Sequence, residues 1–136
     1  MKLVFGDSFY FIALLNARDF HHVQALSITR ELPLRMVTTR WVIAEVGNAL
    51  SGLGARKSFA AFVRGLDTQN RVAVLPNSDT LYDQGVRLFS SRPDKEWSLT
   101  DCISMEAMRG EGLTEVLTGD RHFAQAGFKL LMDSSP

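Results

Sequence analysis

Cysteine is almost absent from this chain of 136 residues, and its scarcity excludes two kinds of structure. The single cysteine, Cys102, cannot form an internal disulfide, and one thiol cannot build a cysteine-rich zinc site. Histidine is scarce as well, and the adjacent His21 and His22 point in different directions on a helix, which makes them a poor pair of metal ligands. One free thiol fits a reducing cytoplasm, which is the location that we expect.

Long apolar runs and a net charge are also lacking. No stretch approaches the roughly 20 apolar residues of a membrane-spanning helix, and the apolar stretch at the start is too short for a signal peptide. Fifteen basic residues balance fifteen acidic ones, so no overall field indicates a nucleic-acid partner. A hydrophobic content of 46% and a charged content of 22% are typical of a soluble globular protein. We therefore expect a soluble protein with no membrane partner.

The chain does contain a regular alternation of short apolar runs and longer amphipathic segments. The apolar runs predict strands at 3–5, 34–38, 71–75, 115–118 and 128–131. The amphipathic segments predict helices at 8–15, 19–31, 40–53, 56–67, 79–89 and 99–109, and a short helical turn after residue 120. Strands separated by helices require crossover connections, so we expect a three-layer α/β/α domain with a mostly parallel sheet. The length predicts one domain over residues 1–136.

Four acidic residues stand out by their positions in this pattern. Asp7 and Asp120 each follow an apolar run. Asp101 lies at the start of a predicted helix, and Glu45 lies within the otherwise apolar helical segment 41–50. Ligands of parallel α/β sheets bind beyond the carboxyl ends of the strands, so we expect these acids around one crevice. Carboxylates suit Mg²⁺ or Mn²⁺, and the set therefore indicates metal-assisted phosphodiester hydrolysis.

Each acid also has a purely structural explanation. Asp7 and Asp120 are suitable N-caps for the helices that follow them. Asp101 stands three residues after Ser98, which is the spacing of a capping box. Glu45 can lie at the edge of the apolar stripe, with its carboxylate in water or paired with an arginine. Capping and metal binding are compatible, because a helix amino end stabilises the charged carboxylate that a cation needs.

The same acids lie in segments that resemble the PIN-domain family of nucleases. These segments are 3–15, a second-helix pattern at Asp19, His22 and Ala25, Thr38-Thr39 followed by Glu45 and Asn48, 97–104, and 117–127. The resemblance implies a five-stranded parallel sheet and cleavage of single-stranded RNA with Mg²⁺ or Mn²⁺. It implies that the catalytic metal ligands are Asp7, Glu45, Asp101 and Asp120. Many members of this length are ribonuclease toxins of the VapC type, so a homodimer and an inhibitory antitoxin are also implied.

Three further residues are candidates for roles beside the acids. Ser8 matches the small hydroxyl residue that follows the first acid in the family, where it would orient Asp7 or a bound water. The alternative for Ser8 is an exposed serine in the first helical turn. Asn48 belongs to the second family segment, and Arg121 is a candidate for contact with the RNA backbone.

Other positions near these segments carry weaker expectations. Gly6 and Gly119 depart from the family pattern, in which a bulkier apolar residue and a polar residue are more usual. We expect both glycines to loosen the floor of the pocket. Trp97 has the chemistry to stack a nucleobase and His122 to contact a phosphate, but for both we expect a packing role.

Two hypotheses of different classes follow. The first is a metal-dependent endoribonuclease that acts as the toxin of a toxin–antitoxin pair. The second is a catalytically weak PIN-like module that binds RNA or a protein without cleaving it. A response-regulator-like domain is disfavoured, because the chain lacks the expected adjacent acids before the second helix and the lysine at a late strand end.

Overall fold

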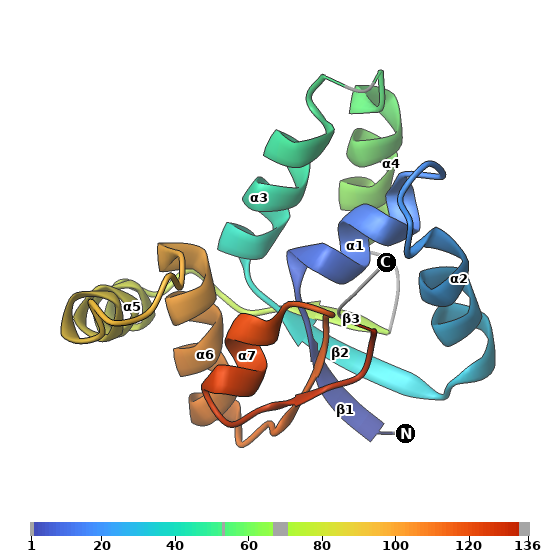
Figure 1. The fold of residues 1–136 in the computed structure, drawn as a ribbon. Helices are drawn as coiled ribbons and strands as arrows, with labels where there is room; N and C mark the ends of the chain where they lie inside the picture. The colour runs from blue at the N-terminus through green and yellow to red at the C-terminus, as the bar shows by residue number, and fades with distance from the viewer. Residues whose placement is uncertain (1, 53, 67–70, 134–136) are drawn as a thin grey trace.

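Five short strands form one sheet in which each strand runs parallel to its neighbours (Figure 1). The computed structural model describes residues 2–52, 54–66 and 71–133. The strands are β1 (Lys2–Gly6), β2 (Leu34–Thr38), β3 (Val72–Val74), β4 (Glu115–Leu117) and β5 (Lys129–Leu130). Their spatial order is β3-β2-β1-β4-β5. The predicted five-stranded sheet is confirmed, and it is parallel at every pairing described.

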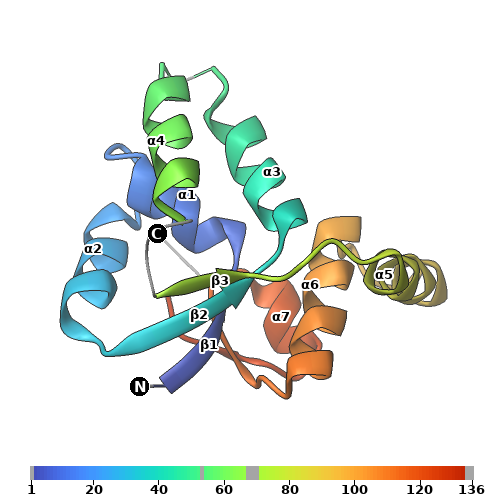
Figure 2. The same cartoon turned by 180° about the vertical axis from the view of Figure 1, so that it is seen from behind.

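Helices from the described residues cover the sheet. They are α1 (Ser8–Leu15), α2 (His22–Glu31), α3 (Arg40–Leu50), α4 (Arg56–Leu66), α5 (Asp79–Ser91), α6 (Leu99–Glu111) and α7 (Arg121–Gln125). The helices α1 to α4 gather on one side of the sheet and α5 to α7 on the other, which confirms the three-layer prediction (Figures 1 and 2). Among the described residues, no helix combines the length and apolar character that crossing a membrane requires.

The core lies where the central strands meet the helices on both faces. In β1 and β4, Val4, Phe5, Val116 and Leu117 are fully buried, as expected for parallel strands covered on both sides. Helix α6 contributes more buried residues than any other described helix, whereas α4 has none in the buried class. The most deeply buried part of the core is therefore the contact of β1 and β4 with their flanking helices.

Several predicted element boundaries are exact, and others shift for local reasons. The helix at 8–15 and the strand at 34–38 are observed as predicted. The helix predicted over 19–31 begins at His22, because Asp19 Oδ1 accepts a hydrogen bond from His21 N at 2.8 Å and closes a turn. Helix α6 continues to Glu111 and ends before Gly112, whose φ of 69° is the left-handed value that terminates helices. The helix predicted over 40–53 ends at Leu50, because Ser51 is its C-cap and residues 51–52 form a turn. The helix end predicted at 67 lies outside the described residues.

The strand order determines where a site can form. The chain leaves β1 toward β2 and β3 on one side, whereas β4 and β5 extend the sheet on the other side. The carboxyl ends of β1 and β4 therefore flank a switch in strand order, which is the usual ligand position in open α/β sheets. Asp7 directly follows β1, and Asp120 follows β4.

Candidate active site

The four predicted acids come from four different elements at this end of the sheet. Asp7 stands between β1 and α1, and Glu45 lies in the middle of α3. Asp101 is in the first turn of α6, and Asp120 is the N-cap of α7. The charges of Glu45 and Asp101 both act on Asp7. Asp101 and Asp120 lie close together, with ligand atoms within 4.8 Å of each other. The structure therefore brings the four acids together beyond the carboxyl ends of β1 and β4, the position of the ligand crevice in open α/β sheets.

Asp7 is the most deeply buried of these acids, with 3% of its surface exposed. It occupies the N-cap position of α1, yet its side chain makes no capping hydrogen bond. The carboxylate turns toward β4 instead, where Thr118 Oγ1 donates to Asp7 Oδ2 at 2.8 Å. The other oxygen, Oδ1, is buried and has no hydrogen-bond partner among the described residues. The capping explanation for Asp7 is therefore wrong.

This environment makes Asp7 hard to ionise. Burial raises its pKa from 3.8 to about 7, although the hydrogen bond from Thr118 lowers it. The neighbouring charges of Asp101 and Glu45 raise the pKa further. A carboxylate in this condition is stabilised either by a proton or by a cation that supplies the missing positive charge.

Glu45 is held by α1. Ser8 Oγ donates a hydrogen bond to Glu45 Oε1, and Ser8 itself is only 7% exposed. The alternative of an exposed serine is therefore wrong, and the hydroxyl of Ser8 bonds to Glu45 rather than to Asp7. Glu45 is half-buried. Its described hydrogen-bond partner is Ser8, whereas the structural alternative for Glu45 included pairing with an arginine. This hydrogen bond holds the Glu45 carboxylate next to Ser8, the residue that follows Asp7.

Asp101 serves the fold and the crevice together. Its backbone N–H donates to Ser98 Oγ at 3.0 Å, and Asp101 Oδ2 accepts from Ser98 N at 3.2 Å. The predicted capping box is thus confirmed. The same oxygen lies 3.0 Å from His122 Nδ1. Burial raises the pKa of Asp101 above its usual value, although the His122 hydrogen bond lowers it.

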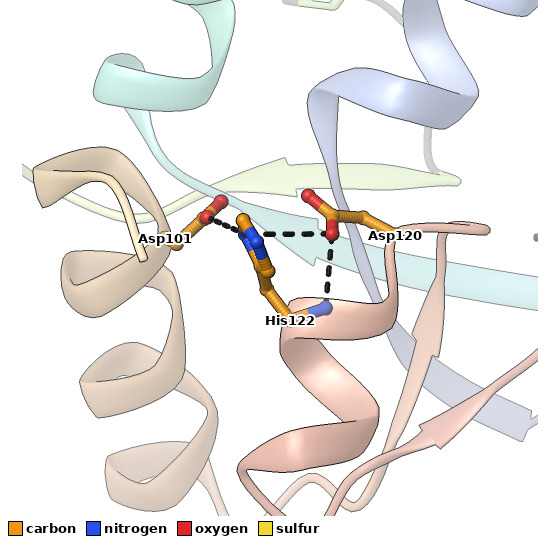
Figure 3. Close-up of side chains that lie close together, drawn as sticks. All are labelled: Asp101, Asp120 and His122. Atoms are coloured by element: carbon orange, nitrogen blue, oxygen red, sulfur yellow. Dashed lines mark hydrogen bonds and ion pairs between the residues drawn. The ribbon is translucent and has the colours of Figure 1, made fainter. Parts of the chain in front are cut away.

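Asp120 caps the short helix α7 and shares the histidine with Asp101. Its Oδ1 accepts from His122 N at 2.9 Å and lies 3.5 Å from His122 Nδ1. Figure 3 shows the imidazole of His122 between the two carboxylates. Burial lowers the pKa of His122, but the hydrogen bond to Asp101 and the charge of Asp120 outweigh burial, and the pKa lies above its usual value. A protonated His122 would neutralise part of the charge of this pair.

Two members of this arrangement were not expected from the sequence. His122 was assigned a packing role, yet its polar contacts place it among groups that can hold a metal ion, together with Asp101 and Asp120. Thr118 donates to Asp7 and also accepts from Asp120 N at 3.1 Å, so one hydroxyl joins the ends of β1 and β4. Their spacing in the sequence could have indicated both residues, because each stands two positions from Asp120 along the chain.

The remaining candidates lie at the edge of this arrangement or outside it. Asn48 is exposed and lines a pocket between α3 and α4 together with Arg56 and Phe59. Arg121 is exposed at the first position of α7. Trp97 is 5% exposed, and its Nε1 donates to Gln125 Oε1 at 2.9 Å, so its role is packing, as expected.

The two glycines that depart from the family pattern do not loosen the pocket. A Cβ on Gly6 would lie 3.0 Å from the ring of Phe11 and 3.2 Å from Met36 Sδ. A Cβ on Gly119 would lie 2.2 Å from the carbonyl oxygen of Asp133, and 2.6 Å from Phe9. The expectation of a loose floor is wrong, because larger neighbours fill the space that each glycine leaves.

The donor set of the crevice fits a hard divalent cation. It offers carboxylate oxygens from Asp7, Asp101 and Asp120, and Glu45 beside them, which are the ligands that Mg²⁺ and Mn²⁺ prefer. The unpartnered Asp7 Oδ1 is an oxygen that the protein itself leaves unsatisfied. Clustered carboxylates repel one another unless a proton or a cation compensates them.

Comparison with known proteins identifies the class to which this fold and crevice belong. Residues 4–129 match the PIN domain, and the chain therefore belongs to the PIN-domain family. It is 28% identical over 127 residues to the 23S rRNA-specific endonuclease VapC20 of Mycobacterium tuberculosis, in strains CDC 1551 / Oshkosh and ATCC 25618 / H37Rv. That alignment covers 93% of this chain and 95% of VapC20.

Solved structures show the same relationship. The crystal structure of M. tuberculosis VapC20, described as a Sarcin-Ricin loop cleaving toxin, matches with a TM-score of 0.84 and 25% identity, over 92% of this chain and 95% of that one. The crystal structure of FitAcB from Neisseria gonorrhoeae matches with a TM-score of 0.59 and 18% identity, over 97% of each chain. The second match shows a shared fold. Homology to a VapC toxin endonuclease confirms the family expected from the sequence.

Proposed function

We propose that this protein is a divalent-cation-dependent endoribonuclease, the toxin of a toxin–antitoxin pair, with residues 1–136 forming one PIN domain. The observation that carries the proposal is the buried Asp7 oxygen without a partner, at a site where three other acids gather. A buried carboxylate needs a compensating charge, and a cation supplies one. The relationship to VapC20 supports RNA as the substrate.

The ligands of the cation are, in this proposal, Asp7, Glu45, Asp101 and Asp120, either directly or through water. Magnesium and manganese accept such oxygen donors readily and keep several waters of their own. When bound, the cation supplies Lewis-acid chemistry, which favours ionisation of water near neutral pH and offsets charge on the phosphate. The cation also replaces the proton that burial otherwise leaves on Asp7.

The surrounding residues keep the carboxylates in place for this task. Thr118 and Ser8 each donate a hydroxyl hydrogen bond to one carboxylate and so fix its orientation. His122 holds Asp101 and Asp120 close together against their mutual repulsion. Arg121, exposed beside Asp120, is available to an RNA phosphate. Outer contacts of this kind orient metal ligands and affect both metal affinity and activity.

The substrate and partners follow from the relatives. VapC20 is a 23S rRNA-specific endonuclease, and its crystal structure describes it as cleaving the Sarcin-Ricin loop. The coverage of nearly the whole of both chains supports a ribosomal RNA loop as the substrate here. In the same proposal the protein acts in the cytoplasm as a homodimer, and a small antitoxin protein inhibits it.

A cleavage assay tests this function. Purified protein is incubated with 23S rRNA and with a single-stranded RNA oligonucleotide, with Mn²⁺ or with a chelator. We expect cutting that requires the cation and is lost in Asp7→Asn. The matched control is Asp94→Asn, because Asp94 is exposed and pairs with Arg92 at 2.9 Å outside the crevice.

The control variant should cut as the wild type does. Cutting that persists with the chelator, or that is equal in Asp7→Asn, would contradict the proposed site. RNA binding without cutting in any condition would support the PIN-like binding module in place of a nuclease.

A further inference from the structure

Two partly exposed aromatic side chains stack on each other across two helices. The ring centroids of Trp41 on α3 and Tyr82 on α5 lie 6.2 Å apart with an interplanar angle of 27°. Tyr82 is 41% exposed and Trp41 is half-buried. Other large aromatics near the crevice, such as Trp97 and Phe123, are buried. An aromatic pair that keeps open surface forgoes part of the free energy of burial, so its placement calls for an explanation.

The pair is connected to the acids through α3. Trp41 precedes Glu45 by four residues on α3, and side chains at this spacing are neighbours on one helix face. Side chains of a helix lean toward its amino end, so the Glu45 carboxylate leans toward the turn that carries Trp41. Helix α3 also packs against α6, which carries Asp101. Figures 1 and 2 show the start of α3 next to the start of α6.

The local backbone and charge suit a nucleic-acid strand. Thr39 caps α3 by accepting a hydrogen bond from Val42 N at 3.2 Å, so the turn that carries Trp41 is firmly held. Arg40, directly before Trp41, is exposed. An exposed arginine in the same helical turn as a partly exposed aromatic supplies both parts of single-strand binding, with phosphates on the cation and bases on the ring.

We propose that Trp41 and Tyr82 form a platform on which an unpaired RNA base stacks, next to the phosphate that is cleaved. This inference rests on the proposed ribonuclease function and adds the residues that position its substrate. The ligand class is an unpaired nucleobase in a single strand or loop, because bases within a duplex have no free face. Trp97 does not take this role, because it is buried and the guanidinium of Arg92 lies over its ring at 5.1 Å.

The test measures RNA binding in the Asp7→Asn background, where cleavage does not interfere. A single-stranded RNA oligonucleotide is titrated against Trp41→Leu and Tyr82→Leu, which keep an apolar side chain and remove the aromatic face. We expect binding to weaken by roughly 5- to 100-fold in each, the usual effect of losing one stacked base. Trp41→Phe and Tyr82→Phe should keep most of the affinity.

The matched control is Phe89→Leu, because Phe89 is 48% exposed on the same helix and lies seven residues beyond Tyr82. This variant should bind RNA as its parent does. Tryptophan fluorescence gives a second measurement: stacking quenches it, and Trp41→Phe should remove the quenching while buried Trp97 still emits. Thermal melts of all five variants establish that each is folded, and the phenylalanine variants decide the question if a leucine variant of the pair is not.

The outcomes separate this inference from the proposed function. Unchanged RNA binding in both leucine variants overturns the platform, even if the wild type cuts RNA. A change in sedimentation with unchanged RNA binding also overturns it and assigns the aromatic pair to contact with a second copy. Weakened binding in these variants, together with a wild type that does not cut, supports the platform and rejects the nuclease. Absence of RNA binding in the Asp7→Asn parent rejects the platform.

Discussion

The two sides of the crevice hold their carboxylates in opposite ways. Asp101 and Asp120 each accept a backbone N–H at the start of a helix, and both contact His122. Asp7 also stands at the start of a helix, but its carboxylate makes no capping hydrogen bond and leaves one oxygen unpartnered. The carboxylates of Asp101 and Asp120, the capped pair, have hydrogen-bond donors with or without a cation. The Asp7 carboxylate is fully compensated only when a proton or a cation binds to it.

This difference shows that position along the chain does not determine the chemistry of an acid. All three aspartates lie at helix starts, where a carboxylate usually gains from the free amides. The hydroxyl of Thr118 on the neighbouring strand draws Asp7 into the sheet end instead. The buried carboxylate then opposes folding when it is charged, which is typical of groups kept for function rather than for stability.

Replacing Asp7 should have the largest effect on stability. The pKa of Asp7 in the fold is about 7, because burial raises it from 3.8. Between pH values of about 4 and about 7, the folded state therefore keeps a proton on Asp7 that the unfolded chain has released. Without metal, the free energy of unfolding of the wild type should therefore fall as pH rises from about 4 to about 7, by up to roughly 4 kcal/mol. Asp7→Asn should lack this fall, as measured by urea unfolding in a chelator.

The control for this experiment is Asp94→Asn. The hydrogen bond from Arg92 lowers the pKa of Asp94 to about 2, so its titration lies below the pH range of interest. This variant should show the same fall as the wild type. A wild-type stability that is flat between about pH 4 and pH 7 would contradict the assignment of Asp7 as the uncompensated acid.

Adding a divalent cation should produce the next largest effect. At about pH 8 the Asp7 carboxylate is charged, and a cation that binds only the folded state stabilises it by about 3 kcal/mol at roughly 100 times its dissociation constant. We expect thermal unfolding of the wild type and of Asp94→Asn to shift upward with Mg²⁺ or Mn²⁺. The shift should be much smaller in Asp7→Asn. An equal shift in all three proteins would place the cation elsewhere.

The sequence predicted the layers of the fold and the four acids, because both depend on local pattern. Apolar runs separated by amphipathic segments indicate parallel strands with crossover helices, and acids that follow such runs are recognisable without a structure. The motif resemblance then selected the same acids. Boundaries failed where a side chain altered the backbone locally, as Asp19 does before α2.

The contacts between the acids were not predictable in the same way, because they join segments far apart in the chain. Ser8 bonds to Glu45 across α1 and α3, and Thr118 bonds to Asp7 across β4 and β1. Sequence spacing places a hydroxyl near an acid only within one element. The close contacts of Gly119 likewise depend on the neighbouring Asp133 and Phe9, which no local pattern shows.

Removing the Thr118 hydroxyl, which bonds to Asp7, should change the free energy of unfolding by less than the bound cation does. Thr118→Val leaves Asp7 Oδ2 without its donor and Asp120 N without its acceptor. We expect a loss of about 1–3 kcal/mol in the free energy of unfolding, larger at about pH 8 than at about pH 5, because the charged carboxylate depends most on the donor.

The control is Thr29→Val, which breaks a contact with the Tyr10 hydroxyl instead. Its loss should be the same at both pH values, since neither hydroxyl titrates there. An equal pH response in the two variants would contradict the role of Thr118.

Replacing His122 should have the smallest effect, and with the opposite dependence on pH. The pKa of His122 in the fold lies above its usual value, because Asp101 and Asp120 together outweigh the effect of burial. A raised pKa stabilises the fold below the usual value of the histidine, and this stabilisation is lost as pH rises through the folded value. His122→Ala should therefore be less stable than the wild type by about 1 kcal/mol at about pH 5, given the partial exposure of the ring, and the difference should shrink at about pH 8. His122→Gln keeps a donor that cannot titrate, so it should recover part of the loss without restoring the pH dependence. If His122→Ala instead lost most stability at about pH 8, the histidine would act through packing. The difference between the capped pair and Asp7 would then come only from the backbone N–H groups that Asp101 and Asp120 accept.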